Sequence, residues 1–202
     1  MKYKTVVIDP PWSLNFNAGE RVASQQGGYY ACQDKIYDLM PLEDIFDFPI
    51  NDFAADESMI FLWVTNGKIE QKPVISIGYE LLERWGFEYH NMITWVKPSA
   101  TCIFSPLMVK TEHVLLGWRG NFRTLTDKQN AVMSNVLVES GYALKHSQKP
   151  SRFYQLLRGW TPKPRIDIFA RRAHEGFDGW GDEYVGNSDE GTLLEFMEKE
   201  SS

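Results

Sequence analysis

A short β-branched run near the start of the chain ends in two consecutive prolines, and this junction limits the folds that the chain can adopt. Residues 4–8 (KTVVI) are followed at once by Asp9, Pro10, Pro11 and Trp12. A strand cannot continue through this segment, because neither proline has an N–H for the ladder. The sequence therefore predicts a buried strand that ends in a rigid loop, with Asp9 at its carboxyl end.

Further apolar runs alternate with helical patterns along the rest of the chain. Strands are predicted at residues 59–64, 88–96, 113–118, 136–139 and 165–170, and helices at 73–85 and 150–160. Alternating strands and helices predict an α/β fold, a doubly wound and mostly parallel sheet with helices on both faces. In such a sheet, ligands bind beyond the carboxyl ends of the strands, where Asp9 and Arg171 fall.

Length and composition narrow the class of protein. The 202 residues suit one globular domain, which we expect over residues 1–185, followed by an acidic tail at 186–202. Cys32 and Cys102 have no CxxC spacing, so neither a disulfide framework nor a cysteine zinc site is expected. We expect a cytoplasmic protein, because no secretory leader and no membrane-spanning apolar run is apparent.

The net charge of −6 hides three unequal blocks. Residues 1–96 carry a net −7, residues 97–172 a net +9, and residues 173–202 a net −8. Basic side chains interleaved with aromatic rings in the middle block suit a nucleic-acid backbone and unstacked bases. The alternative is an ordinary solvated surface whose charges pair with the acidic blocks. On the first interpretation, Lys97, Arg119 and Arg123 are candidate nucleic-acid contacts, and the loops at 99–110 and 119–129 are candidates for target recognition.

The segment from Asp9 to Trp12 has the groups needed to activate an exocyclic amino group on a base. The lone pair of that nitrogen is delocalised into the ring, which makes it a poor nucleophile. If the Asp9 carboxylate and the Pro10 carbonyl each accept one amino proton, the lone pair can turn towards an electrophile. Pro11 helps to fix the backbone, and Trp12 offers a flat face for a flipped base. The alternative is a strand that stops at a proline turn beside a packing Trp.

This tetrapeptide resembles the signature of the amino-methyltransferases that use S-adenosylmethionine. Six further segments resemble, in order, the family of the seventy-kilodalton adenosine methyltransferase subunit. They are FLWVT at 61–65, WGFE at 85–88, WVK at 95–97, TEHVLLGWRGN at 111–121, HSQKP at 146–150 and RIDIFAR at 165–171. The resemblance covers residues 4–185 and implies a Rossmann-like fold in which the catalytic strand precedes the cofactor strand. It also implies methylation of the N6 amino group of adenine in DNA or RNA.

The resemblance implies roles for individual residues. Ile8 and Asp9 would lie near the cofactor, Lys149 would pair with its methionine carboxylate, and Phe169 and Arg171 would lie near its ribose and adenine. Asp182 and Glu183 would bind its ribose hydroxyls. Among the histidines, His146 and His174 are the ones expected to touch the cofactor. Tyr37 resembles a family tyrosine that closes over substrate and cofactor, with Tyr29 and Tyr30 as alternatives.

DNA is the expected substrate, because the chain lacks the large extensions of the RNA-modifying members. The alternatives are the same reaction on RNA adenosine, methylation of the cytosine amino group, and a noncatalytic nucleic-acid-binding partner subunit. A homodimer or a heterodimer remains open. No metal is expected, since His90, His113, His146 and His174 share no metal-binding spacing.

Overall fold

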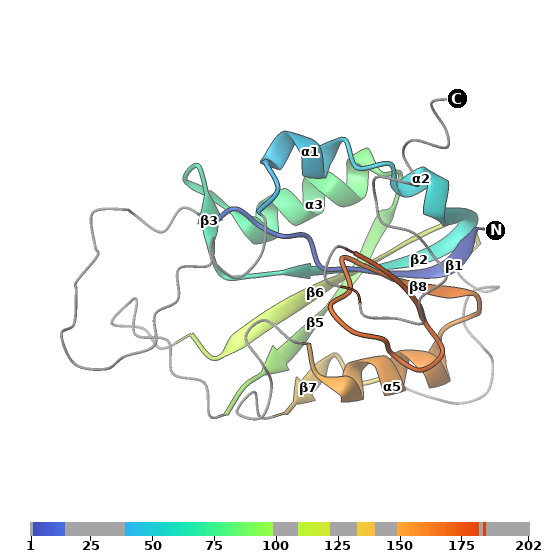
Figure 1. The fold of residues 1–202 in the computed structure, drawn as a ribbon. Helices are drawn as coiled ribbons and strands as arrows, with labels where there is room; N and C mark the ends of the chain where they lie inside the picture. The colour runs from blue at the N-terminus through green and yellow to red at the C-terminus, as the bar shows by residue number, and fades with distance from the viewer. Residues whose placement is uncertain are drawn as a thin grey trace.

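A seven-stranded sheet runs through the middle of the protein, in the order β7-β5-β6-β2-β1-β8-β9 (Figure 1). The computed structural model describes residues 2–14, 39–98, 109–121, 133–139, 149–181 and 184. The strands are β1 (Tyr3–Ile8), β2 (Ala54–Val64), β5 (Glu88–Val96), β6 (Thr111–Arg119), β7 (Val136–Val138), β8 (Arg165–Ile168) and β9 (Asp178–Trp180). Only β6 runs against its two neighbours, and the other paired strands of this sheet are parallel. The expected α/β fold with a mostly parallel sheet is confirmed.

Helices cover both faces of this sheet. Figure 1 shows α1 (Leu42–Phe46), α2 (Ile50–Phe53) and α3 (Val74–Arg84) on one side and α5 (Ser151–Trp160) on the other. Side chains of β1 alternate between the two layers, because successive residues of a strand point to opposite faces. Val6 and Ile8 belong to the core beneath α1 and α3, whereas Val7 belongs to the core beneath α5. The sheet is thus buried on both faces, which explains its near-continuous apolar runs.

Helix α3 lies unusually close to the sheet at Gly78. A Cβ atom at this position would lie 2.7 Å from both Leu115 Cδ1 and Val64 Cγ1, so only a glycine fits without a shift of its neighbours. The helix ends at Arg84, and Gly86 follows with a φ of +75°, a conformation that glycine adopts at little cost. The helix predicted at residues 73–85 is thus confirmed, with its end one residue earlier.

Several short elements were not predicted from the sequence. These are α1, α2, β9 and the hairpin of β3 (Lys68–Ile69) and β4 (Lys72–Pro73). The hairpin turn uses Glu70 and Gln71 at φ values of +49° and +68°, where glycine or asparagine is the usual signal. None of these elements is long enough to display a periodic pattern.

Two other expectations concern membranes and the tail. Of the helices in the described part of the chain, none has the length and apolar character that a bilayer crossing requires. The acidic tail predicted at residues 186–202 lies outside the described residues.

Candidate active site

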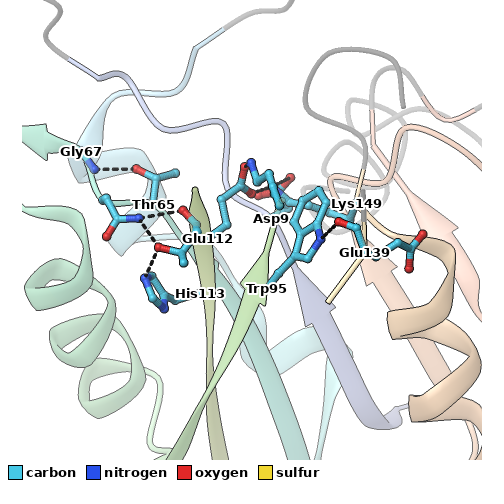
Figure 2. A network of polar contacts seen from close by, with 11 residues as sticks. Asp9, Thr65, Gly67, Trp95, Glu112, His113, Glu139 and Lys149 are labelled. Atoms are coloured by element: carbon cyan, nitrogen blue, oxygen red, sulfur yellow. Dashed lines mark hydrogen bonds and ion pairs between the residues drawn. The ribbon is translucent and has the colours of Figure 1, made fainter. Parts of the chain in front are cut away.

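Topology brings five chain segments to one edge of the sheet. The carboxyl ends of β1, β2 and β8 meet there because these strands are parallel, and β5 ends at the same edge. Strand β6 runs the opposite way, so its first residues, Thr111 and Glu112, join them. Figure 2 shows Asp9, Glu112 and Lys149 converging at this edge.

Asp9 is held at the end of β1 by the backbone on both sides of it. Its N–H donates to the Ile168 carbonyl at 3.3 Å, which extends the pairing with β8 by one residue. After the prolines, the Trp12 N–H donates to the Pro10 carbonyl at 2.8 Å, and the Met40 N–H donates to the Pro11 carbonyl at 3.1 Å. The loop is therefore fixed by its own turn and by a second segment. A carbonyl oxygen can accept twice, so the Pro10 carbonyl retains capacity for one further donor.

Four charged side chains form an alternating chain across the site. The Lys149 ammonium lies 3.1 Å from Asp9 Oδ2 and 3.0 Å from Glu112 Oε2. Lys97 donates to the other oxygen of Glu112. All four side chains are at most one-fifth exposed, so water screens these contacts only weakly.

Two tryptophan rings support the lysines of this chain. Lys149 Nζ lies 4.8 Å from the centre of the Trp63 ring, and Lys97 Nζ lies 4.5 Å from that of Trp95. The two rings meet edge to face at 6.1 Å. A cation over an aromatic face is stabilised electrostatically, most strongly where water is excluded. Each ammonium group is thus positioned by a tryptophan ring as well as by the carboxylates.

The pKa values of the three innermost groups reflect this arrangement. Burial alone would raise the pKa of Glu112, but attraction to Lys149 and Lys97 outweighs it and lowers the pKa to about 2. Burial would lower the pKa of Lys149, yet Asp9 and Glu112 together raise it. For Asp9, burial prevails over the attraction of Lys149, and the pKa of the carboxyl is above its ordinary value. Lys149 therefore remains a cation at neutral pH.

A pocket opens beside Asp9 and Lys149. Its lining residues are Asp9, Lys149, Tyr154, Asp167, Phe169, Ala170, Arg171, Arg172 and His174. Five of the residues expected to bind the cofactor are thus brought together: Asp9, Lys149, Phe169, Arg171 and His174. Their roles stay predictions, but the structure places them around one opening.

The wall formed by the segment after β8 has an unusual backbone. Phe169 has a φ of +61°, a conformation that few residues other than glycine adopt, and its ring packs on Phe48 and Trp180. The His174 ring stacks on Tyr154 with centroids 3.4 Å apart. Burial and the neighbouring Arg172 guanidinium lower the pKa of His174 to about 4, so this histidine is neutral at pH 7.

Sequence reasoning missed two acidic members of the site. Glu112 follows the first residue of β6, and Asp167 lies between Ile166 and Ile168 in β8 as a residue that is only 3% exposed. The Tyr154 hydroxyl hydrogen-bonds to Asp167, and His174 Nε2 lies 3.9 Å from Asp167 Oδ2. A carboxylate within an apolar strand is the signal that could have identified Asp167, since such a residue is almost never buried without a reason.

The structure corrects the expectation for Trp12. The ring is 2% exposed and packs in the core beneath α1 and α3, and its indole N–H donates to the Trp63 carbonyl at 3.1 Å. A base cannot stack on a ring that is enclosed in this way. Trp12 instead fastens the loop after β1 to the end of β2.

Arg119 does not reach this site, and its predicted contact with nucleic acid stays a prediction. It lies at the far end of β6, opposite Ser58, and its guanidinium donates to the carbonyls of Ala54 and Ala55. The same group lies 4.9 Å from the centre of the Phe87 ring. The antiparallel direction of β6 sends its two ends to opposite edges of the sheet, so Glu112 joins the site and Arg119 does not.

The structure describes only some of the remaining predicted site residues. Lys97 lies at the site through Glu112, and Ile8 is fully buried beneath Asp9 within the core. Seven expected site residues lie outside the described residues: Tyr29, Tyr30, Tyr37, Arg123, His146, Asp182 and Glu183. Most of the predicted recognition loops at 99–110 and 119–129 also lies outside.

The chemistry of the lining suits a nucleoside-linked amino acid. Lys149 offers a cation for a carboxylate, Asp9 and Asp167 offer carboxyl groups, and Phe169 offers an aromatic surface. Among the described residues, no three His, Cys, Asp or Glu side chains are grouped to hold a metal ion. S-adenosylmethionine, a nucleoside that carries an ammonium, a carboxylate and a sulfonium, fits this set of donors and acceptors.

Comparison with known proteins identifies related chains. This chain is 25% identical to Type II methyltransferase M.MunI of Mycoplasma sp, over 92% of this chain and 79% of that protein. It is 25% identical to N(6)-adenosine-methyltransferase MT-A70-like of Arabidopsis thaliana, over 88% of this chain but only 23% of that protein. It is 27% identical to N6-adenosine-methyltransferase non-catalytic subunit MTB of the same plant, over 62% of this chain and 15% of that protein.

A family model gives the broadest match. The MT-A70 model matches residues 3–183, a range that includes β1, the loop from Asp9 to Trp12, Lys149 and the segment after β8. The match therefore takes in the sheet and the pocket together. On this ground, and consistent with the fold, the chain belongs to the MT-A70 family of methyltransferases.

Proposed function

We propose that this protein transfers the methyl group of S-adenosylmethionine to the N6 amino group of adenine in DNA. The observation that carries the proposal is the position of Asp9, a buried carboxylate at the pocket, directly after a central strand and held by Lys149. The family supports methyl transfer, and relatives named as adenosine N6-methyltransferases support the amino group of adenine.

Activation of the amino nitrogen is the main task of the protein side chains. Lys149 contacts Oδ2 of Asp9, so Oδ1 is the oxygen that we expect to accept one amino proton. The Pro10 carbonyl would accept the other proton, and both acceptors are fixed before the substrate arrives. S-adenosylmethionine supplies a methyl group on a sulfonium, which the nitrogen lone pair can attack in line.

The amino group must also lose one proton when it gains the methyl group. Asp9 is our candidate acceptor, because burial raises the pKa of its carboxyl above the ordinary value. A carboxylate with a raised pKa holds a proton better than a free aspartate does. Lys149 limits this effect through its positive charge, and release of the proton to solvent would restore the ion pair.

The preference for DNA rests on how much of each relative the chain matches. It spans 79% of the type II methyltransferase, but 23% of the plant adenosine methyltransferase. In duplex DNA the target base would have to leave the stack before it reached the pocket, at a cost of a few kcal/mol. Lys97, at the same edge of the sheet, is a candidate phosphate contact once it separates from Glu112.

A noncatalytic partner subunit is the alternative function, because one relative carries that name. Against it, this chain keeps Asp9 and Lys149 together at the pocket. A scaffold has no need of a buried ion pair at the end of a strand, since apolar side chains of similar volume would stabilise the fold as well.

The test measures label transfer from S-adenosylmethionine with a labelled methyl group. The purified full chain is incubated with duplex DNA, single-stranded DNA or RNA of the same base composition. We expect label on DNA and little on RNA, and Asp9→Ala should abolish transfer. The matched control is Asp52→Ala, which removes an exposed carboxylate on α2.

The outcomes separate the alternatives. Label on RNA alone would contradict the DNA substrate, and no label on any nucleic acid would contradict the enzyme. Normal transfer by Asp9→Ala would show that this carboxylate is not part of the machinery. Circular dichroism of both variants confirms that any loss does not arise from unfolding.

A further inference from the structure

Asp167 is a buried carboxylate in the wall of the pocket that the proposed methyl transfer does not use. Its carboxyl group interacts with Tyr154 of α5, and the residue is 3% exposed. Burying an ionised carboxylate is costly unless a cation lies beside it. The groups around Asp167 therefore decide its charge.

Five titratable or charged groups face it from the elements packed around it. They are Tyr154 on α5, Lys149 before α5, Asp9 after β1, and Arg172 and His174 in the segment after β8. Within the described part of the chain, no lysine or arginine lies within ion-pair distance of Asp167, whereas Lys149 lies 3.1 Å from Asp9. His174, 3.9 Å away, is neutral at pH 7 and supplies no positive charge.

The result is a carboxyl group that keeps its proton near neutrality. Burial, and to a smaller extent the charge of Asp9, raise the pKa of Asp167 to about 8, because the Tyr154 hydrogen bond and the more distant cations offset only part of their effect. At pH 7 the side chain is mostly a neutral acid. A ligand that brought a positive charge to this position would favour the ionised form.

The amino acid part of the proposed cofactor carries such a charge. It is a zwitterion, with a carboxylate that suits Lys149 and an ammonium on the same carbon, and both Lys149 and Asp167 line the pocket. We propose that Asp167 binds this ammonium and releases its own proton to solvent as the ligand enters. The inference rests on the proposed function, because it takes S-adenosylmethionine as the ligand. Asp167 would thus be a cofactor-binding residue whose ionisation is coupled to binding.

The test measures binding of S-adenosylhomocysteine, which retains the ammonium and carboxylate and cannot donate a methyl group. Titration calorimetry of the full chain in two buffers with different ionisation enthalpies counts the protons released. Only the ionised form of Asp167 should bind the ligand tightly. Because the pKa of Asp167 is near 8, the affinity for S-adenosylhomocysteine should rise roughly five-fold between pH 7 and pH 8. Nearly one proton should be released for each ligand bound at pH 7.

Two variants and one truncated ligand sharpen the test. Asp167→Asn should bind S-adenosylhomocysteine at least about ten-fold more weakly at pH 8 and lose both the pH dependence and the proton release. Tyr154→Phe removes a hydrogen bond that lowers the pKa of Asp167, so its affinity curve should move to higher pH. 5′-Methylthioadenosine, which lacks the amino acid part, should bind Asp167→Asn and the unaltered chain equally well.

The outcomes distinguish this inference from the proposed function. If the unaltered chain binds neither ligand, the proposed function fails and the inference with it. If it binds S-adenosylhomocysteine without releasing a proton, or if Asp167→Asn keeps the pH dependence, only the role of Asp167 is overturned. Equal losses for both ligands in Asp167→Asn would show a purely structural role and would overturn it as well.

Discussion

Replacing Glu112 with glutamine should destabilise the protein, because Glu112 is the acceptor shared by two lysines. Lys149 and Lys97 lower the pKa of this carboxyl from 4.5 to about 2 despite its burial. Each pKa unit corresponds to about 1.4 kcal/mol, so the ionised carboxylate contributes roughly 3 kcal/mol at neutral pH. Glutamine keeps the size of the side chain and one acceptor oxygen but loses the charge.

The sign of the pH dependence follows from the direction of this shift. A lowered pKa in the folded state means that the stabilisation is complete above pH 4.5 and is lost as the pH falls towards 2. Glu112→Gln should therefore unfold roughly 6–12 °C below the unaltered chain at pH 7, as expected for a loss of about 3 kcal/mol in a domain of this size. At pH 3.5 the difference should shrink by about 1.4 kcal/mol.

Urea denaturation at pH 7 and pH 3.5 measures the two differences in the free energy of unfolding, and a thermal scan at pH 7 measures the shift in unfolding temperature. Glu175→Gln is the matched control, since Glu175 also pairs with an arginine, Arg158, but its side chain is 86% exposed. No measurable change is expected there, because exposed ion pairs contribute little. Equal stability of Glu112→Gln and the unaltered chain at pH 7, or a difference that does not shrink at low pH, would refute the reasoning.

Two further predictions concern packing. Gly78→Ala should lower the free energy of unfolding by about 1 kcal/mol or more, because its Cβ would lie 2.7 Å from two side chains of the core. Gly159→Ala in α5 is the control, because a Cβ at this position would meet open space and should raise the free energy of unfolding by up to about 1 kcal/mol. A similar change in stability at both sites would contradict this account. Trp12→Phe should cost roughly 1–3 kcal/mol in urea denaturation, since it leaves the Trp63 carbonyl without its donor, whereas unchanged stability would show that this hydrogen bond is unimportant.

The long strands and the two longer helices could be predicted because their patterns are strong. β5 occupies residues 88–96 as expected, and α3 and α5 begin one residue after the predicted starts at 73 and 150. α1 and α2 could not, because they have five and four residues and follow Pro41 and Pro49. Helical periodicity needs more than one turn to become visible.

The candidate site could be predicted only in part, because strand register is not visible in a sequence. Asp9 was identified from the prolines that follow it, and Lys149 from the family resemblance. Glu112 reaches them only because β6 runs antiparallel to β2, which pairs Val64 with His113. The same reversal carries Arg119 to the far edge. Trp12 was misassigned because an aromatic residue beside a predicted site can face the core as readily as the ligand.

The central claim is that Asp9 organises methyl transfer to the amino group of adenine. The most direct measurement is mass spectrometry of nucleosides from duplex DNA incubated with the protein and S-adenosylmethionine. The account predicts N6-methyladenine with the unaltered chain and none with Asp9→Asn, although that variant should remain folded. Methylated cytosine in place of adenine, or N6-methyladenine formed equally by Asp9→Asn, would contradict it.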